Sequence, residues 1–115
     1  MLSPEDNETV TRVGPGTPMG QLMRQYWIPF LSSSDVARDG QPYRVRLLGE
    51  DLVAYRDSNG TVGLVEAYCP HRGARLSRGE VLGDNISCRY HGVTLDGSGT
   101  IVRVPAMPGC AQLEW

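Results

Sequence analysis

Two short segments, each with one cysteine and one histidine, constrain this chain more than any other feature. One residue separates Cys69 from His71, and two residues separate Cys88 from His91. Sixteen residues lie between His71 and Cys88, and a glycine closely follows each histidine. Each segment also follows a strand-like run, so we expect two loops that project from a β scaffold and meet at their tips.

These four side chains are of the types that bind soft or borderline metals. Thiolate suits zinc, copper(I) and iron–sulfur iron, and imidazole suits zinc, copper and iron. The residues alone leave two readings open: one tetrahedral zinc ion, or a two-iron cluster with thiolates on one iron and imidazoles on the other. Zinc fingers usually pair cysteines on one knuckle and histidines elsewhere. Here each loop supplies one of each, which favours the cluster.

Short strand-like runs and turn signals fill the rest of the chain. We expect strands over residues 28–31, 43–48, 52–56, 62–67, 86–88, 93–95 and 101–104, with turns at 49–51, 57–60 and 96–99. A short helix is expected over residues 19–26, with Thr17 as its N-cap and Pro18 as its first residue. This pattern predicts an all-β fold, a small antiparallel barrel or sandwich with a short N-terminal helix.

The chain has the length of a single domain, which we assign to residues 1–115. We expect a poorly ordered N-terminal extension over about residues 1–12. The net charge of −2 offers no broad basic field for nucleic acid, and no apolar run is long enough to cross a membrane. The acidic N-terminus lacks a signal-peptide pattern, so we expect a cytoplasmic protein. Three cysteines, an odd number, argue against a disulfide scaffold, and Cys110 is expected to be a free thiol.

The two loops are similar to the Rieske motif, in which Cys-x-His precedes Cys-x-x-His. Residues 5–8, 13–20, 26–27 and 46–52 further resemble the N-terminal domain of Rieske non-haem iron oxygenase α subunits. The branch named by this resemblance is that of phthalate and phenoxybenzoate dioxygenases. It covers the chain to about residue 108 and implies a Rieske-type [2Fe–2S] cluster in loops within residues 69–92. Cys69 and Cys88 would then ligate one iron, and His71 and His91 the other.

The resemblance also assigns neighbouring residues. Gly73 and Gly92 would permit tight loops, and Pro105 and Pro108 fall where the family has a proline-containing loop over the cluster. Two departures concern other positions. Val93 stands where the family usually has tryptophan, and position 74 is not the extra cysteine of respiratory Rieske proteins. The second departure indicates the lower-potential oxygenase or ferredoxin type.

The function implied is one-electron transfer within an aromatic-ring-hydroxylating oxygenase. The alternatives are a stand-alone Rieske ferredoxin and, less favoured, a structural zinc-binding module. In the family a second domain holds a mononuclear iron through two histidines and a carboxylate. This chain has only two histidines and the cluster takes both, so we expect no catalytic mononuclear site and no oxygenase activity from it alone.

The resemblance implies redox partners for this chain. A reductase would donate electrons, a mononuclear non-haem iron oxygenase domain would accept them, and a homo-oligomer is expected. In the family more strands follow the proline loop, so we interpret the sequence as either a fragment or a shortened ferredoxin-like protein.

Overall fold

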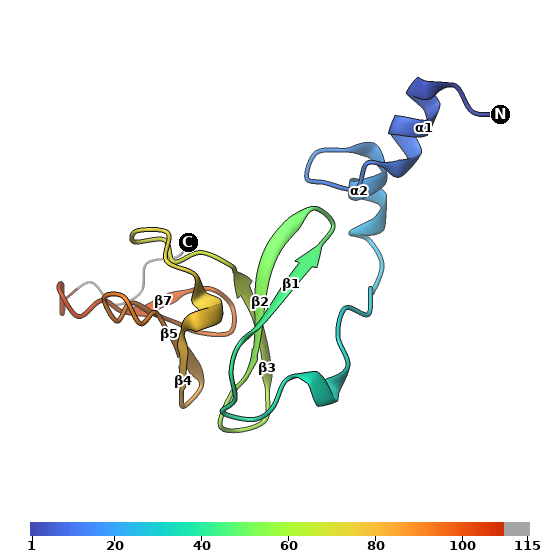
Figure 1. Ribbon diagram of the computed structural model, residues 1–115. Helices are drawn as coiled ribbons and strands as arrows, with labels where there is room; N and C mark the ends of the chain where they lie inside the picture. Colours follow the sequence, from blue (N-terminus) through green and yellow to red (C-terminus); the bar gives the residue numbers. More distant parts are fainter. Residues whose placement is uncertain (110–115) are drawn as a thin grey trace. The chain divides into compact units, whose positions relative to one another are not determined.

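The computed structural model describes residues 1–109, and the chain divides into two compact units (Figure 1). The first unit comprises Met1–Leu31 with Arg46–Glu50, and the second comprises Ser32–Val45 with the chain from Asp51 onward. Each unit is described by itself. Cys110 lies outside the described residues.

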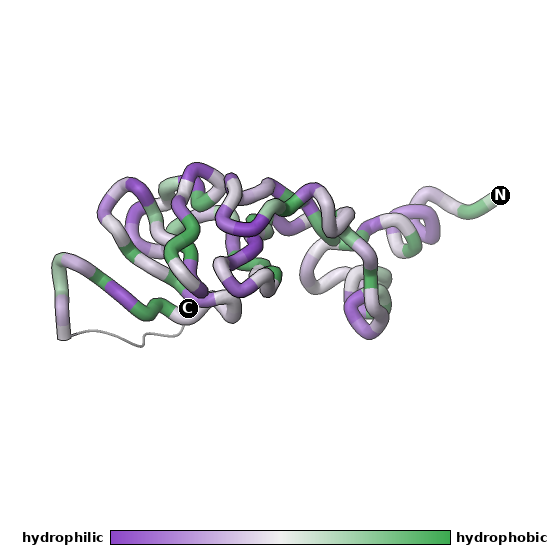
Figure 2. Tube along the Cα trace, turned by 90° about the horizontal axis from the view of Figure 1, so that it is seen from below, coloured by the Kyte–Doolittle hydropathy of each residue, from purple (hydrophilic) through white to green (hydrophobic). Residues whose placement is uncertain are grey.

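The first unit begins with helix α1 (Pro4–Thr11), where we expected a poorly ordered extension. That expectation was wrong because the segment carries its own helix signals. Ser3 is the N-cap, and its hydroxyl oxygen accepts a hydrogen bond from the Asp6 amide at 3.0 Å. Pro4 is the first helical residue, and Glu8 pairs with Arg12 one turn later. No residue of α1 is buried, and its segment is mostly hydrophilic in Figure 2.

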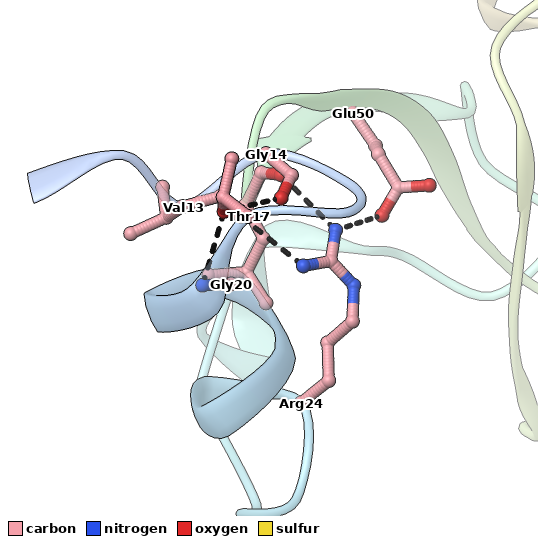
Figure 3. Close-up of polar contacts among 7 residues, drawn as sticks. Val13, Gly14, Thr17, Gly20, Arg24 and Glu50 are labelled. Atoms are coloured by element: carbon pink, nitrogen blue, oxygen red, sulfur yellow. Dashed lines mark hydrogen bonds and ion pairs between the residues drawn. The ribbon is translucent and has the colours of Figure 1, made fainter. Parts of the chain in front are cut away.

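Helix α2 (Pro18–Met23) has the expected start. The Thr17 hydroxyl oxygen accepts from the Gly20 amide at 3.2 Å, and the hydroxyl donates to the Gly14 carbonyl at 2.7 Å (Figure 3). A Cβ at Gly20 would lie 2.4 Å from two backbone carbonyl oxygens, so this helix start needs glycine. The regular helix stops at Met23, earlier than expected, because the amides of Gln25 and Tyr26 donate to carbonyls only three residues back, those of Leu22 and Met23.

Arg24 fastens the turn between the first two strands to this helical segment (Figure 3). Its guanidinium donates to the carbonyls of Val13 at 3.1 Å and Leu48 at 3.2 Å, and to a Glu50 carboxylate oxygen at 2.7 Å. Leu48 and Gly49 both have positive φ, at 48° and 79°, as a tight two-residue hairpin turn requires.

Two sheets carry the rest of the fold, and the predicted all-β class with antiparallel pairing is confirmed. The three-stranded sheet has the order β1 (Tyr43–Leu47), β2 (Glu50–Arg56), β3 (Val62–Glu66). The four-stranded sheet has the order β4 (Glu80–Leu82), β5 (Asn85–Ser87), β6 (Thr94–Leu95), β7 (Ile101–Arg103), with all its pairs antiparallel. Two 3-10 turns, η1 (Ser33–Asp35) and η2 (Leu76–Arg78), complete the described elements.

The strand predictions differ from the structure at two places. Residues 28–31 form no strand; Pro29 lacks the N–H that a ladder needs and constrains the residue before it. Strand β4 was not predicted, because a three-residue strand with a single half-buried Val81 carries no periodic signal.

The core lies in the second unit and draws on both sheets. Val53 and Tyr55 of β2 pack with Ile86 of β5 and with Leu76, and each is at most 1% exposed. Cys69 and Cys88 belong to the same buried cluster. The two cysteines are therefore held in place by the packed side chains of the core.

Two turns with the same hydrogen-bond pattern, each built on an aspartate, connect β2 to β3 and β6 to β7. The Asp57 carboxylate accepts the amides of Asn59 at 2.9 Å and Thr61 at 2.8 Å. The Asp96 carboxylate accepts the corresponding amides of Ser98 and Thr100 at 2.9 and 3.0 Å. Both turns lie where the sequence predicted them.

Candidate metal centre

Each of the two Cys-His loops has its own frame of backbone hydrogen bonds, and the two frames have the same pattern. The Cys69 amide donates to the Ala74 carbonyl at 2.8 Å, and the Gly73 amide donates back to the Cys69 carbonyl at 2.9 Å. In the second loop the Cys88 amide donates to the Val93 carbonyl at 2.8 Å, and Gly92 donates to Cys88 at 2.9 Å. In each frame, the backbone of the cysteine is therefore hydrogen-bonded to the fourth and fifth residues after it.

Positive backbone φ angles close both frames. Gly73 has φ of 70° and Gly92 has φ of 74°, a conformation that residues with a Cβ rarely adopt. This agrees with the tight loops that the resemblance implied at these glycines. The equal spacing from cysteine to glycine was visible in the sequence, but the common hydrogen-bond pattern and its carbonyl acceptors were not predicted.

The loops bring like donors together. The imidazole rings of His71 and His91 have centroids 4.6 Å apart at 74°, in an edge-to-face arrangement. The Cys88 thiol lies close enough to that of Cys69 to raise its pKa, and both cysteines belong to one buried cluster. All four predicted ligands are thus found at the meeting of two loops, as a sulfur pair and a nitrogen pair.

The two pairs differ in exposure. Cys69 is 3% exposed and Cys88 4%, whereas both histidines are exposed. Because the cysteines stand at the inner ends of the loops and the histidines farther along, the site has a buried sulfur half and an open nitrogen half.

Burial raises the pKa of the Cys69 thiol, since a thiolate charge is poorly solvated there. Backbone hydrogen bonds from His71 and Arg72 oppose this effect and lower the pKa, whereas the neighbouring Cys88 thiol raises it further. The sulfur thus lies in a dry setting that already points two amide donors at it. Such a setting disfavours a bare thiolate, but suits one whose charge a metal neutralises.

The donor arrangement discriminates between the two readings of the sequence. One tetrahedral zinc ion needs all four donors around one point. Two bridged irons need a pair of donors at each end, which is the grouping of these thiols and imidazoles. The residues present fit the two-iron cluster better.

Two further residues border the second loop. The Tyr90 ring lies against that of His91, with centroids 3.9 Å apart at 40°. A Cβ at Gly92 would lie 3.0 Å from Cγ of Pro105, so this proline packs directly on the loop. Val93, at the place of the family's tryptophan, is 4% exposed and fills the core below.

No helix within residues 1–109 is both long enough and apolar enough to cross a bilayer.

Comparison with protein families matches residues 26–114 to the Rieske [2Fe-2S] domain. The 3-chlorobenzoate-3,4-dioxygenase oxygenase subunit of Comamonas testosteroni is 47% identical over 107 residues, 93% of this chain and 25% of that protein. The phthalate 4,5-dioxygenase oxygenase subunit of Pseudomonas putida is 41% identical over 114 residues, 98% of this chain and 26% of that protein. The chain thus spans about a quarter of the length of these relatives.

Solved structures show the same fold. NdmA of Pseudomonas putida CBB5 has a TM-score of 0.69 at 29% identity, covering 82% of this chain and 31% of that chain. The oxygenase–ferredoxin complex of carbazole 1,9a-dioxygenase has a TM-score of 0.59 at 31% identity, covering 76% of this chain and 22% of that chain.

Proposed function

This chain belongs to the Rieske [2Fe–2S] domain family, and from that premise we propose that Cys69, His71, Cys88 and His91 hold its cluster. The cofactor is a Rieske-type [2Fe–2S] cluster, which carries one electron at a time. In the proposed assignment the two thiols bind one iron and the two imidazoles the other. The observation that carries it is the meeting of like donors: thiol beside thiol, and imidazole edge to face with imidazole at 4.6 Å.

The surrounding residues would hold and tune this centre. The apolar side chains of Leu76 and Ile86, both fully buried, keep water from the sulfur half. The amides of His71 and Arg72 donate to the Cys69 sulfur, and such hydrogen bonds stabilise the more negative, reduced state. The exposed histidines offer the shortest route for an electron to leave or enter.

The chain is homologous to the oxygenase subunits of aromatic dioxygenases, and electron transfer within a Rieske oxygenase is the function that this homology supports. We propose that a reductase donates the electron and that a mononuclear non-haem iron domain accepts it. The only two histidines of the chain are assigned to the cluster, so the accepting iron would be held by residues elsewhere. A homo-oligomer and a cytoplasmic location are parts of the same proposal.

The test is metal and sulfide analysis with a visible and electron paramagnetic resonance spectrum after dithionite reduction. We expect about two irons and two sulfides per chain, and a rhombic signal whose average g value is below that of an all-thiolate cluster. Cys69→Ser should lose the signal, whereas Cys110→Ser, the matched control at the third cysteine, should keep it. A colourless protein with one zinc and no sulfide would contradict the proposal.

A further inference from the structure

The two sides of the centre differ in charge. On the Cys88 side, a hollow of ≈ 510 Å³ is lined by three arginines, Arg75, Arg78 and Arg89, together with Tyr90 and Cys88 itself. On the Cys69 side, a hollow of ≈ 480 Å³ is lined by Glu66 and Tyr68 but by no arginine.

Among residues 1–109, no carboxylate forms an ion pair with the three arginines of the hollow. The ion pairs Arg12–Glu8 and Arg24–Glu50 both lie in the first unit and involve none of these arginines. All three arginines are exposed. Between residues 69 and 93 the chain has four arginines against two acids, Glu80 and Asp84, a surplus of two positive charges in a chain whose net charge is −2. The positive charge is therefore concentrated beside the centre.

The hollow is open to solvent, and its composition suits contact with another protein. Arginine and tyrosine are enriched at interfaces, because each offers a large contact area with a polar end. Tyr90 is 64% exposed, with its ring against His91. Cys88 lines the floor of the hollow, although it is only 4% exposed. A partner seated there would contact both a sulfur ligand and the neighbour of a nitrogen ligand.

We propose that this arginine hollow docks an acidic surface of the protein that donates the electron. The inference rests on the proposed function, since it assumes the cluster at Cys69, His71, Cys88 and His91. Complementary charge steers encounter and fixes orientation, and electron-transfer encounters need only small interfaces. One electron leaves the donor, which is oxidised by one equivalent, and one ferric ion held by this chain becomes ferrous. No atom is transferred.

The test uses stopped-flow reduction of the full, cluster-loaded chain by a reduced plant-type [2Fe–2S] ferredoxin of net negative charge. Arg75→Glu, Arg78→Glu and Arg89→Glu are compared with Arg44→Glu, an exposed arginine of β1 with the same change in net charge. At low ionic strength we expect each hollow variant to lower the second-order rate by about tenfold and Arg44→Glu by less than about twofold. The differences should shrink with added salt.

A second donor separates docking from the cluster itself. The neutral radical of photoreduced 5-deazaflavin should reduce all variants at the wild-type rate. If it does and the ferredoxin rates of the hollow variants equal that of Arg44→Glu, the docking proposal is overturned while the proposed function stands. If no cluster is present, or neither donor reduces it, the proposed function has failed. Saturable phosphate binding that depends on the three arginines but leaves the ferredoxin rate unchanged at constant ionic strength would assign the hollow to a small anion and overturn protein docking.

Discussion

Gly73 and Gly92 occupy equivalent places in two loops of different sequence. Each amide donates at 2.9 Å to the carbonyl of the cysteine four residues earlier, and their φ angles are 70° and 74°. Their surroundings differ. A Cβ at Gly73 would meet no atom within 4 Å, whereas one at Gly92 would lie 3.0 Å from Cγ of Pro105. Alanine substitutions at the two glycines therefore separate the cost of backbone strain from the cost of crowding against Pro105.

We predict that Gly73→Ala costs about 1–2 kcal/mol of unfolding free energy, the usual penalty of the left-handed conformation. Gly92→Ala should cost more, because Pro105 must also move. Urea unfolding of both variants measures the difference. Adding Pro105→Ala to each should recover stability for the Gly92 variant alone. Equal losses for Gly73→Ala and Gly92→Ala would contradict the proposed packing of Pro105.

Alkaline pH should destabilise the fold through Tyr55. This side chain is 1% exposed, and its hydroxyl donates to the Asp84 carbonyl at 3.2 Å. Burial, with the nearby Asp96, Asp57 and Asp84, raises its pKa to about 12. Because the folded pKa exceeds the unfolded value of about 10, the stabilisation is complete below pH 10 and is lost as pH rises from about 10 to 12.

The loss in that interval should be about 2–3 kcal/mol, since each pKa unit corresponds to about 1.4 kcal/mol. Urea midpoints between pH 8 and 12 measure it. Tyr55→Phe should be less stable at pH 8, having lost a hydrogen bond worth about 1 kcal/mol, and should show a flatter decline. A decline of the same size in Tyr55→Phe would show that another group is responsible. The chain contains no lysine, so no lysine side chain titrates in this range.

Acid should weaken the turn built on Asp96. Hydrogen bonds, first from the Ser98 hydroxyl and then from the backbone amides of the turn, lower the pKa of this carboxyl. Its stabilisation is therefore present above the unfolded pKa of about 3.9 and is lost as pH falls through the lower folded value. Asp96→Asn should flatten the acid decline by less than about 1 kcal/mol, because the side chain is partly exposed. An unchanged urea midpoint profile from pH 2 to 5 would contradict this account.

Arg24 should stabilise the first unit far more than Arg12 does. Arg24 donates to two carbonyls and a carboxylate from two separate segments, whereas Arg12 forms only an exposed pair one turn from Glu8. We expect Arg24→Ala to lower the free energy of unfolding by about 1–3 kcal/mol and Arg12→Ala to leave it almost unchanged, because the Arg12–Glu8 pair is fully exposed. Hydrogen exchange of the α2 amides reports both. Similar exchange rates in the two variants would be the contrary result.

Much of this architecture follows from local sequence signals. The Thr17–Pro18 helix start, the Asp turns and most strands were predictable because each depends on a few neighbouring residues. The Ser3 cap carries the same kind of signal, but the helix that it begins is polar and buries no residue, so no apolar periodicity accompanies the cap. Residues 28–31 show the opposite case. Their apolar run predicted a strand, although the proline within it disfavours one.

The sequence indicated which residues to propose for the centre but not how they are laid out. Cysteine–histidine spacing indicated two metal-binding loops, and four residues from cysteine to glycine were visible in each. The packing of Pro105 on Gly92 and the gathering of Arg75, Arg78 and Arg89 around Cys88 depend on tertiary placement. Spacing along the chain carries no information on which face those side chains share.

The most direct test of the account is pulsed electron paramagnetic resonance on the dithionite-reduced protein labelled with ¹⁵N-histidine. The account predicts couplings to two distinct histidine nitrogens on the ferrous iron, one from His71 and one from His91, with none to the ferric iron bound by Cys69 and Cys88. A spectrum with no histidine nitrogen coupling, or a protein with no paramagnetic centre after reduction, would contradict it.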